Sequence, residues 1–201
     1  MNIKEFVGKT KEEAINKALE ELGVEEENLL YKIEEVKGKL FKAATVKVKA
    51  VTINDVSEYL KSYLNELLTN MNIEANYEVN VREGRISIKM FSSQNSILIG
   101  KNGQTLKALT NILKQVVYKD MEVYPYIILD VEDYKEKQEK RLERLAKNIA
   151  REVRTTGVEV AMDNMNSYER RIVHNVLAKY EDLSTNSEGE EPNRHIVVKL
   201  K

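Results

Sequence analysis

The chain has 201 residues and no cysteine; this length exceeds the usual single small domain, and the composition excludes disulfides, thiolate metal sites and thiol nucleophiles. Its 32 Lys and Arg residues nearly balance 33 Asp and Glu residues, so a nucleic-acid partner would have to be held by a local basic patch. The N-terminal sequence MNIKEFVGKTKEEA resembles no signal peptide, and no apolar run approaches the ~18 residues of a membrane span. We therefore expect a cytoplasmic protein.

The first predicted domain, residues 1–52, has the pattern of a β-α-β-β unit. Thr10 and Glu13 form a capping box for a helix that ends at Gly23. A first strand precedes this helix, and further strands are predicted at 29–36 and 44–51, on either side of a Lys-Gly-Lys loop. Lysines alternate along the last strand, which favours a solvated strand face over a polyanion site.

The second predicted domain, residues 53–132, has the order α-β-β-α-α-β. An apolar stripe from Val56 to Met71 predicts the first helix, and alternating apolar residues on both sides of a Glu-Gly turn predict a hairpin. A short helix then runs into Gly100, a longer one follows Gly103, and Pro125 opens the last strand.

Between these two helices lies the sequence GKNG, which comprises Gly100, Lys101, Asn102 and Gly103. Glycines permit positive φ and close backbone approach, and a lysine between them suggests a negatively charged partner such as phosphate. The spacing excludes a nucleotide-binding P-loop, and a dinucleotide fingerprint would need a third glycine in a βαβ unit. What remains is a helix-GxxG-helix turn that can grip a phosphodiester chain, or a plain connection between two helices.

This segment resembles a KH domain of the bacterial, type II arrangement, because residues 99–106 match its IGxxGxxL pattern. The resemblance implies that Gly100, Lys101, Asn102 and Gly103 grip about four nucleotides of single-stranded RNA or DNA. Lys101 would be the electrostatic contact.

The third predicted domain, residues 133–201, begins with a long helix that has eight basic and five acidic residues over 133–154. Leu145 is among the residues expected to face its core, Gly157 is expected to end the helix, and a strand is predicted at 158–162. Asn166 and Glu169 predict the start of another helix, with Tyr168 on or near its buried side. The chain ends on an alternating strand at 196–200, after an acidic loop at 188–191.

In the second of these helices, Arg170 and His174 are spaced i,i+4, so we expect them to share a face turned away from the core. The segment resembles an R-three-H domain, a small sheet backed by helices and named for an Arg-x-x-x-His signature, with Arg171 an additional arginine. The resemblance implies that this face binds single-stranded nucleic acid. A merely solvated face is the alternative, and neither a general base nor a metal site shared with His195 has the neighbouring groups that such chemistry needs.

The order of the three domains resembles the Jag (SpoIIIJ-associated) family of bacterial RNA-binding proteins over essentially the whole chain. We therefore expect an α+β protein with three small domains that binds single-stranded RNA at two sites, with no enzymatic activity, cofactor or metal. The resemblance implies a post-transcriptional regulator linked to cell-envelope, division or sporulation control. The alternative is an adaptor for proteins, and the resemblance implies a small single-domain KH protein and a YidC-type membrane insertase as its partners. Single-stranded DNA as a second ligand and a homo-oligomer are left open.

Overall fold

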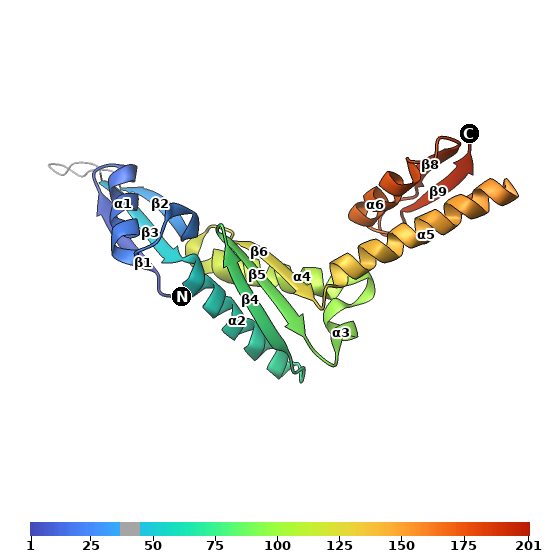
Figure 1. The fold of residues 1–201 in the computed structure, drawn as a ribbon. Coiled ribbons are helices and arrows are strands. Elements are labelled where there is room, and N and C mark those ends of the chain that lie inside the picture. The colour runs from blue at the N-terminus through green and yellow to red at the C-terminus, as the bar shows by residue number, and fades with distance from the viewer. Residues whose placement is uncertain (37–44) are drawn as a thin grey trace. The chain divides into compact units, whose positions relative to one another are not determined.

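The computed structural model describes residues 1–36 and 45–201, so the predicted loop at 37–39 lies outside the described residues. The chain divides into two compact units, residues 1–132 and 133–201. The described residues form three separate three-stranded sheets accompanied by helices (Figure 1). The expected α+β class is therefore confirmed, with one sheet in each of the three predicted segments.

The first sheet has the strand order β1-β3-β2, and both pairs are antiparallel. Its elements are β1 (Lys4–Gly8), α1 (Lys11–Leu22), the 3-10 turn η1 (Glu26–Asn28), β2 (Leu29–Val36) and β3 (Thr45–Thr52). Helix α1 packs against this sheet and, as predicted, begins with a hydrogen bond from the Glu13 amide to the Thr10 hydroxyl and ends at Gly23, whose φ is 64°. The predicted β-α-β-β unit is thus observed.

The lysines of this sheet are paired with carboxylates. Lys47 Nζ lies 2.7 Å from Glu5 Oε2, and Lys32 Nζ lies 2.8 Å from Glu122 Oε2 in the next segment. Strand β3 also runs directly into the next helix, because Thr52 ends the strand and its hydroxyl caps that helix. The first two segments therefore belong to one compact unit.

The second sheet has the order β4-β5-β6, antiparallel between β4 and β5 and parallel between β5 and β6. Parallel neighbours require a crossover connection, and here the GKNG sequence lies in the middle of that crossover. The elements are α2 (Ile53–Asn70), β4 (Asn76–Arg82), β5 (Arg85–Phe91), α3 (Asn95–Ile99), the 3-10 turn η2 (Lys101–Gly103), α4 (Gln104–Met121) and β6 (Tyr126–Val131). This is the predicted α-β-β-α-α-β order.

Residues 133–201 form two helices packed on an antiparallel sheet of order β7-β9-β8. The elements are α5 (Tyr134–Thr156), β7 (Val160–Ala161), α6 (Ser167–Leu177), β8 (Leu183–Glu188) and β9 (His195–Leu200). The predicted helix end at Gly157 and the capping box of Asn166 and Glu169 are both observed.

Two side-chain predictions in this unit are wrong. Leu145 is 39% exposed and Tyr168 is 59% exposed. On α5 Ala146 takes the core-facing position in place of Leu145, beside the buried Ile149 and Val153. Tyr168 lies in the first turn of α6, outside the arc that the sheet and α5 cover.

The described part of the chain contains no helix that is both long enough and apolar enough to cross a lipid bilayer.

Candidate nucleic-acid interface

The GKNG turn has a backbone that only these residue types accommodate easily. Gly100 has φ 69° and ψ −177°, a region that is essentially restricted to glycine. A Cβ at this position would lie 2.1 Å from Thr105 Oγ1. Asn102 (φ 50°) and Gly103 (φ 74°) are left-handed as well, and asparagine is among the few other residues that tolerate this conformation. The turn is therefore specified by its sequence and is more than a loose connection.

This turn presents polar groups to solvent at the beginning of α4. Lys101, Asn102 and Lys107 are exposed, and no side chain among the described residues caps the N-terminus of α4. The free N–H groups and positive dipole of a helix N-terminus attract anions. Ile97, one turn before the GKNG sequence, is 51% exposed and adds an apolar surface. The four predicted residues therefore lie together in a turn that can hold a phosphodiester next to a base.

Arg170 is not on the exposed face that the sequence predicts. It is 8% exposed, and its Nη1 donates hydrogen bonds to the Met165 carbonyl at 2.7 Å and to Glu191 Oε1 at 2.8 Å. The i,i+4 spacing does place Arg170 beside His174. However, the loops before α6 and before β9 cover this side of the helix, so the buried arc of α6 is wider than its apolar residues indicate. The guanidinium therefore joins the two loops.

His174 is likewise engaged inside the unit, where both ring nitrogens have hydroxyl partners on β8. Nδ1 lies 2.8 Å from Thr185 Oγ1 and Nε2 lies 2.9 Å from Ser187 Oγ. Burial lowers the pKa of His174 below its ordinary value, and the charge of Arg170 lowers it further. A neutral imidazole suits this site, because one nitrogen can donate a hydrogen bond while the other accepts one. His174 thus ties α6 to β8.

Of the three predicted residues on α6, only Arg171 is exposed to solvent. It follows Arg170 directly and lies outside the buried arc of the helix. The structure therefore brings the Arg-x-x-x-His residues together. Arg170 and His174 form hydrogen bonds inside the unit, and Arg171 beside them is exposed to solvent.

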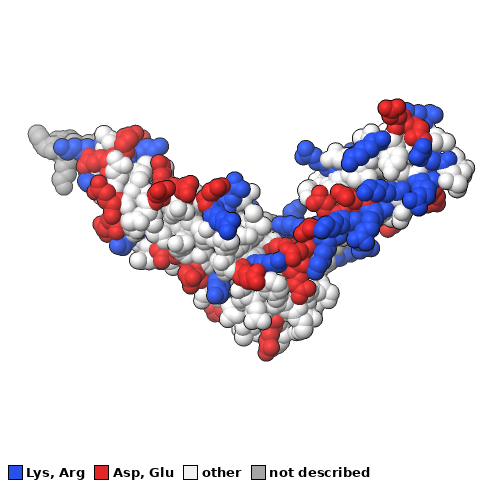
Figure 2. All heavy atoms as spheres, in the orientation of Figure 1, with Lys and Arg blue, Asp and Glu red and all other residues white. Residues whose placement is uncertain are grey.

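The sequence predicted an excess of basic residues on the helix at 133–154, but it was not used to predict that several of them share one face of α5. Figure 2 shows Lys and Arg side chains gathered along this helix. They recur four, three, four and three residues apart, which keeps them on one helical face. This spacing could have identified the basic face from the sequence. The face comprises Lys140, Arg144, Lys147, Arg151 and Arg154.

No group of three or more His, Asp or Glu side chains in the described residues could hold a metal ion.

Three family models match the chain in succession. The Jag N-terminus model matches residues 6–51, the KH domain model matches residues 59–163, and the R-three-H domain model matches residues 140–200. The KH match extends beyond β6 into α5, so the two C-terminal matches overlap.

The chain is similar to several curated relatives along most of its length. The RNA-binding protein KhpB of Clostridium symbiosum is 37% identical over 208 residues, which cover 100% of this chain and 93% of that protein. The protein of the same name from Bacillus subtilis is 29% identical, with 96% of each chain covered. A third, from Lactiplantibacillus plantarum, is 32% identical over 71% of this chain and 44% of its own length. With three family models in the same order and a relative similar from end to end, the chain belongs to the Jag family of bacterial proteins.

Proposed function

We propose that this protein binds single-stranded RNA in bacteria, with the GKNG turn as its principal grip. The observation that carries the proposal is the backbone of Gly100, Asn102 and Gly103, which opens an uncapped helix N-terminus to solvent beside exposed Lys101. Gly100, Lys101, Asn102 and Gly103 would hold about four nucleotides. The relatives' shared name, RNA-binding protein KhpB, supports this assignment.

The second RNA contact that we propose lies beside the Arg-x-x-x-His residues of the R-three-H unit, which is the compact unit of residues 133–201. Arg171 is exposed there and can bind phosphate or stack on a base. Arg170 and His174 would act by fixing the neighbouring loops and β8, since Arg170 Nη1 and both ring nitrogens of His174 already have partners. Two weak sites on one chain bind a long strand more tightly than either alone, by roughly 10²-fold or more where the RNA spans both.

A matched pair of variants tests the GKNG turn. In Lys101→Asp with Asn102→Asp, aspartate keeps the left-handed conformation accessible at position 102, while the added charges repel phosphate. In the control, Lys61→Asp with Asn65→Asp, the same charge change falls on exposed positions of α2. RNA affinity in a gel-shift titration should fall roughly tenfold or more for the first variant only. Equal affinities for the two variants would remove the turn from the binding surface.

The biological role that we propose is post-transcriptional regulation connected with cell-envelope, division or sporulation control. Crosslinking RNA to the protein in cells and sequencing it tests this role directly. Recovered transcripts without any such connection would exclude it.

One observation favours a second candidate function, an adaptor for proteins. Tyr118 and Tyr124 stack with ring centroids 4.4 Å apart, and Tyr124 and Tyr126 are 53% and 59% exposed. Exposed tyrosines are typical of protein interfaces. A small single-domain KH protein, a YidC-type insertase or a second copy of the chain could bind there. The adaptor function would take precedence if the protein binds no RNA at micromolar concentration in low salt but captures one of these proteins, and if Tyr124→Asp abolishes that capture.

A further inference from the structure

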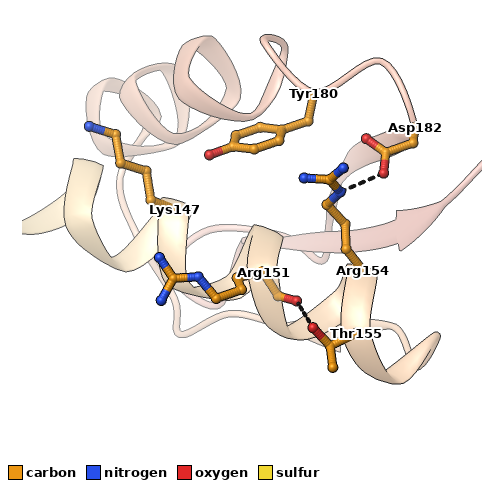
Figure 3. A pocket seen from close by; sticks show the side chains of 6 residues that line it. All are labelled: Lys147, Arg151, Arg154, Thr155, Tyr180 and Asp182. Carbon is orange, nitrogen blue, oxygen red and sulfur yellow. Dashed lines mark hydrogen bonds and ion pairs between the residues drawn. The ribbon is translucent and has the colours of Figure 1, made fainter.

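A pocket in the R-three-H unit lies between the second half of α5 and the segment that connects α6 to β8. Its volume is about 630 Å³, and three of its lining residues are cationic while one is acidic. The lining residues are Lys147, Arg151, Arg154, Thr155, Tyr180 and Asp182 (Figure 3). None of them belongs to the GKNG turn or to the Arg-x-x-x-His residues.

The one carboxylate of this pocket is already neutralised. Arg154 Nε donates a hydrogen bond to Asp182 Oδ2 at 2.7 Å, and the same guanidinium lies over the Tyr180 ring, 5.8 Å from its centroid. These two contacts already restrict the Arg154 side chain, so little further conformational entropy is lost there when a ligand binds. The pocket therefore keeps an excess of positive charge.

The other two cations have no such partner. Lys147 and Arg151 are exposed, and in the part of the chain that the structure describes neither forms an ion pair. Figure 3 shows the Tyr180 hydroxyl pointing toward the side of the pocket from which Lys147 and Arg151 extend. Two unpaired cations and a hydroxyl facing one hollow are suited to an anionic oxygen ligand.

The pocket is also continuous with a longer basic surface. Lys140 and Arg144 precede Lys147, Arg151 and Arg154 on the same face of α5 and are exposed, with Lys140 paired to the exposed Glu136 carboxylate. At 1.5 Å per residue, this row of cations extends for about 21 Å along the helix. A row of cations can bind several negative charges spaced along one ligand. A polynucleotide backbone has such charges, whereas a single small anion would occupy only one position of the row.

We infer that this face of α5 and its pocket form a further phosphate-binding site, which holds successive backbone phosphates of single-stranded RNA. Arg151 and Lys147 contact one phosphodiester in the pocket, the Tyr180 hydroxyl donates a hydrogen bond to it, and Arg144 and Lys140 contact its neighbours. The inference rests on the proposed RNA-binding function and adds to it a site outside both family signatures.

The test uses the full chain and a mixed-sequence RNA of about 20 nucleotides, several times the ~4 nucleotides of one KH site. Lys147→Glu with Arg151→Glu reverses two charges in the pocket. The control, Lys61→Glu with Lys199→Glu, reverses two exposed charges that do not line the pocket. Lys199 alternates with buried Val198, so it lies on the face of β9 turned away from the helices. Thermal unfolding should be alike for the two variants, because all four side chains are exposed.

Fluorescence anisotropy in increasing KCl measures the affinity and its salt dependence. The pocket variant should bind roughly tenfold more weakly, with a log-log salt slope smaller by about 0.7, since Lys147 and Arg151 share one phosphate and each lost phosphate contact contributes about 0.7. The control should keep the parent's slope. If the pocket variant matches the control in affinity and slope, the inference is overturned while the RNA-binding proposal stands.

Two further arms separate the remaining explanations. In the background of Lys101→Asp with Asn102→Asp, the residual RNA binding should disappear when the pocket charges are also reversed; a residual binding that persists would contradict the inference.

RNA with a 5′-phosphate and RNA with a 5′-hydroxyl should bind equally, and a preference for the phosphorylated end that the pocket variant abolishes would refute the assignment to internal phosphates. Absence of RNA binding by the parent chain would overturn both proposals together.

Discussion

Replacing Arg170 by alanine should destabilise residues 133–201, because the side chain joins two loops from the inside. Its charged hydrogen bond to the Met165 carbonyl is of a kind worth about 1.5–3 kcal/mol. The ion pair with Glu191, whose side chain is 59% exposed, adds only about 0.2–1 kcal/mol. We expect a total loss of about 2–4 kcal/mol, which corresponds to a roughly 30- to 700-fold increase in opening of the unit, at 1.4 kcal/mol per factor of ten.

Native-state hydrogen exchange of amides in α6, β8 and β9 measures this opening in the full chain. The matched control is Arg171→Ala, which removes the same side chain from the adjacent, exposed position and should leave protection of these amides nearly unchanged. Equal protection in the two variants would refute the structural role of Arg170. A variant at Arg170 that loses RNA affinity while its protection is retained would instead make this guanidinium a direct RNA contact.

Three other outcomes are expected. His174 has a lowered pKa in the folded chain, so its contribution to stability is present above the ordinary histidine pKa of about 6.5 and is lost as pH falls toward the folded value; calorimetry between about pH 7.5 and 5.5 should show a larger fall in Tm for the parent than for His174→Gln, and parallel curves would contradict this. Gly100→Ala should cost about 1–3 kcal/mol through its backbone conformation alone, and more through the contact with Thr105; urea unfolding should therefore show a larger loss than Gly23→Ala, where a Cβ meets nothing within 4 Å. Affinity measured on oligonucleotides of increasing length should rise steeply once one strand can occupy the sites of both units, and the full chain should have a steeper salt slope than residues 1–132; length-independent affinity would argue against cooperation.

Local sequence signals determined most of the secondary structure. The helix beginning at Thr10, the capping box of Asn166 and Glu169, and the glycines at the ends of α1 and α5 act within a few residues of where they stand. The GKNG sequence belongs to the same class, because glycine adopts the positive φ seen at Gly100 and Gly103 without the steric cost that a Cβ would bring. These features could therefore be recognised from the sequence, as could the order of the three segments.

Only the tertiary structure decided which side chains are free to bind. Helical spacing places Arg170 and His174 on one face, but it does not reveal that Met165, Glu191 and β8 cover that face. The pocket beside Tyr180 depends equally on long-range packing, since Arg154 and Tyr180 meet only when α6 folds back against α5. Periodicity fixes which residues of one element are neighbours, whereas burial depends on the element that packs against them. For that reason the sequence identified the proposed RNA-binding turn, while the surroundings of Arg170, His174 and the α5 cations became apparent only in the fold.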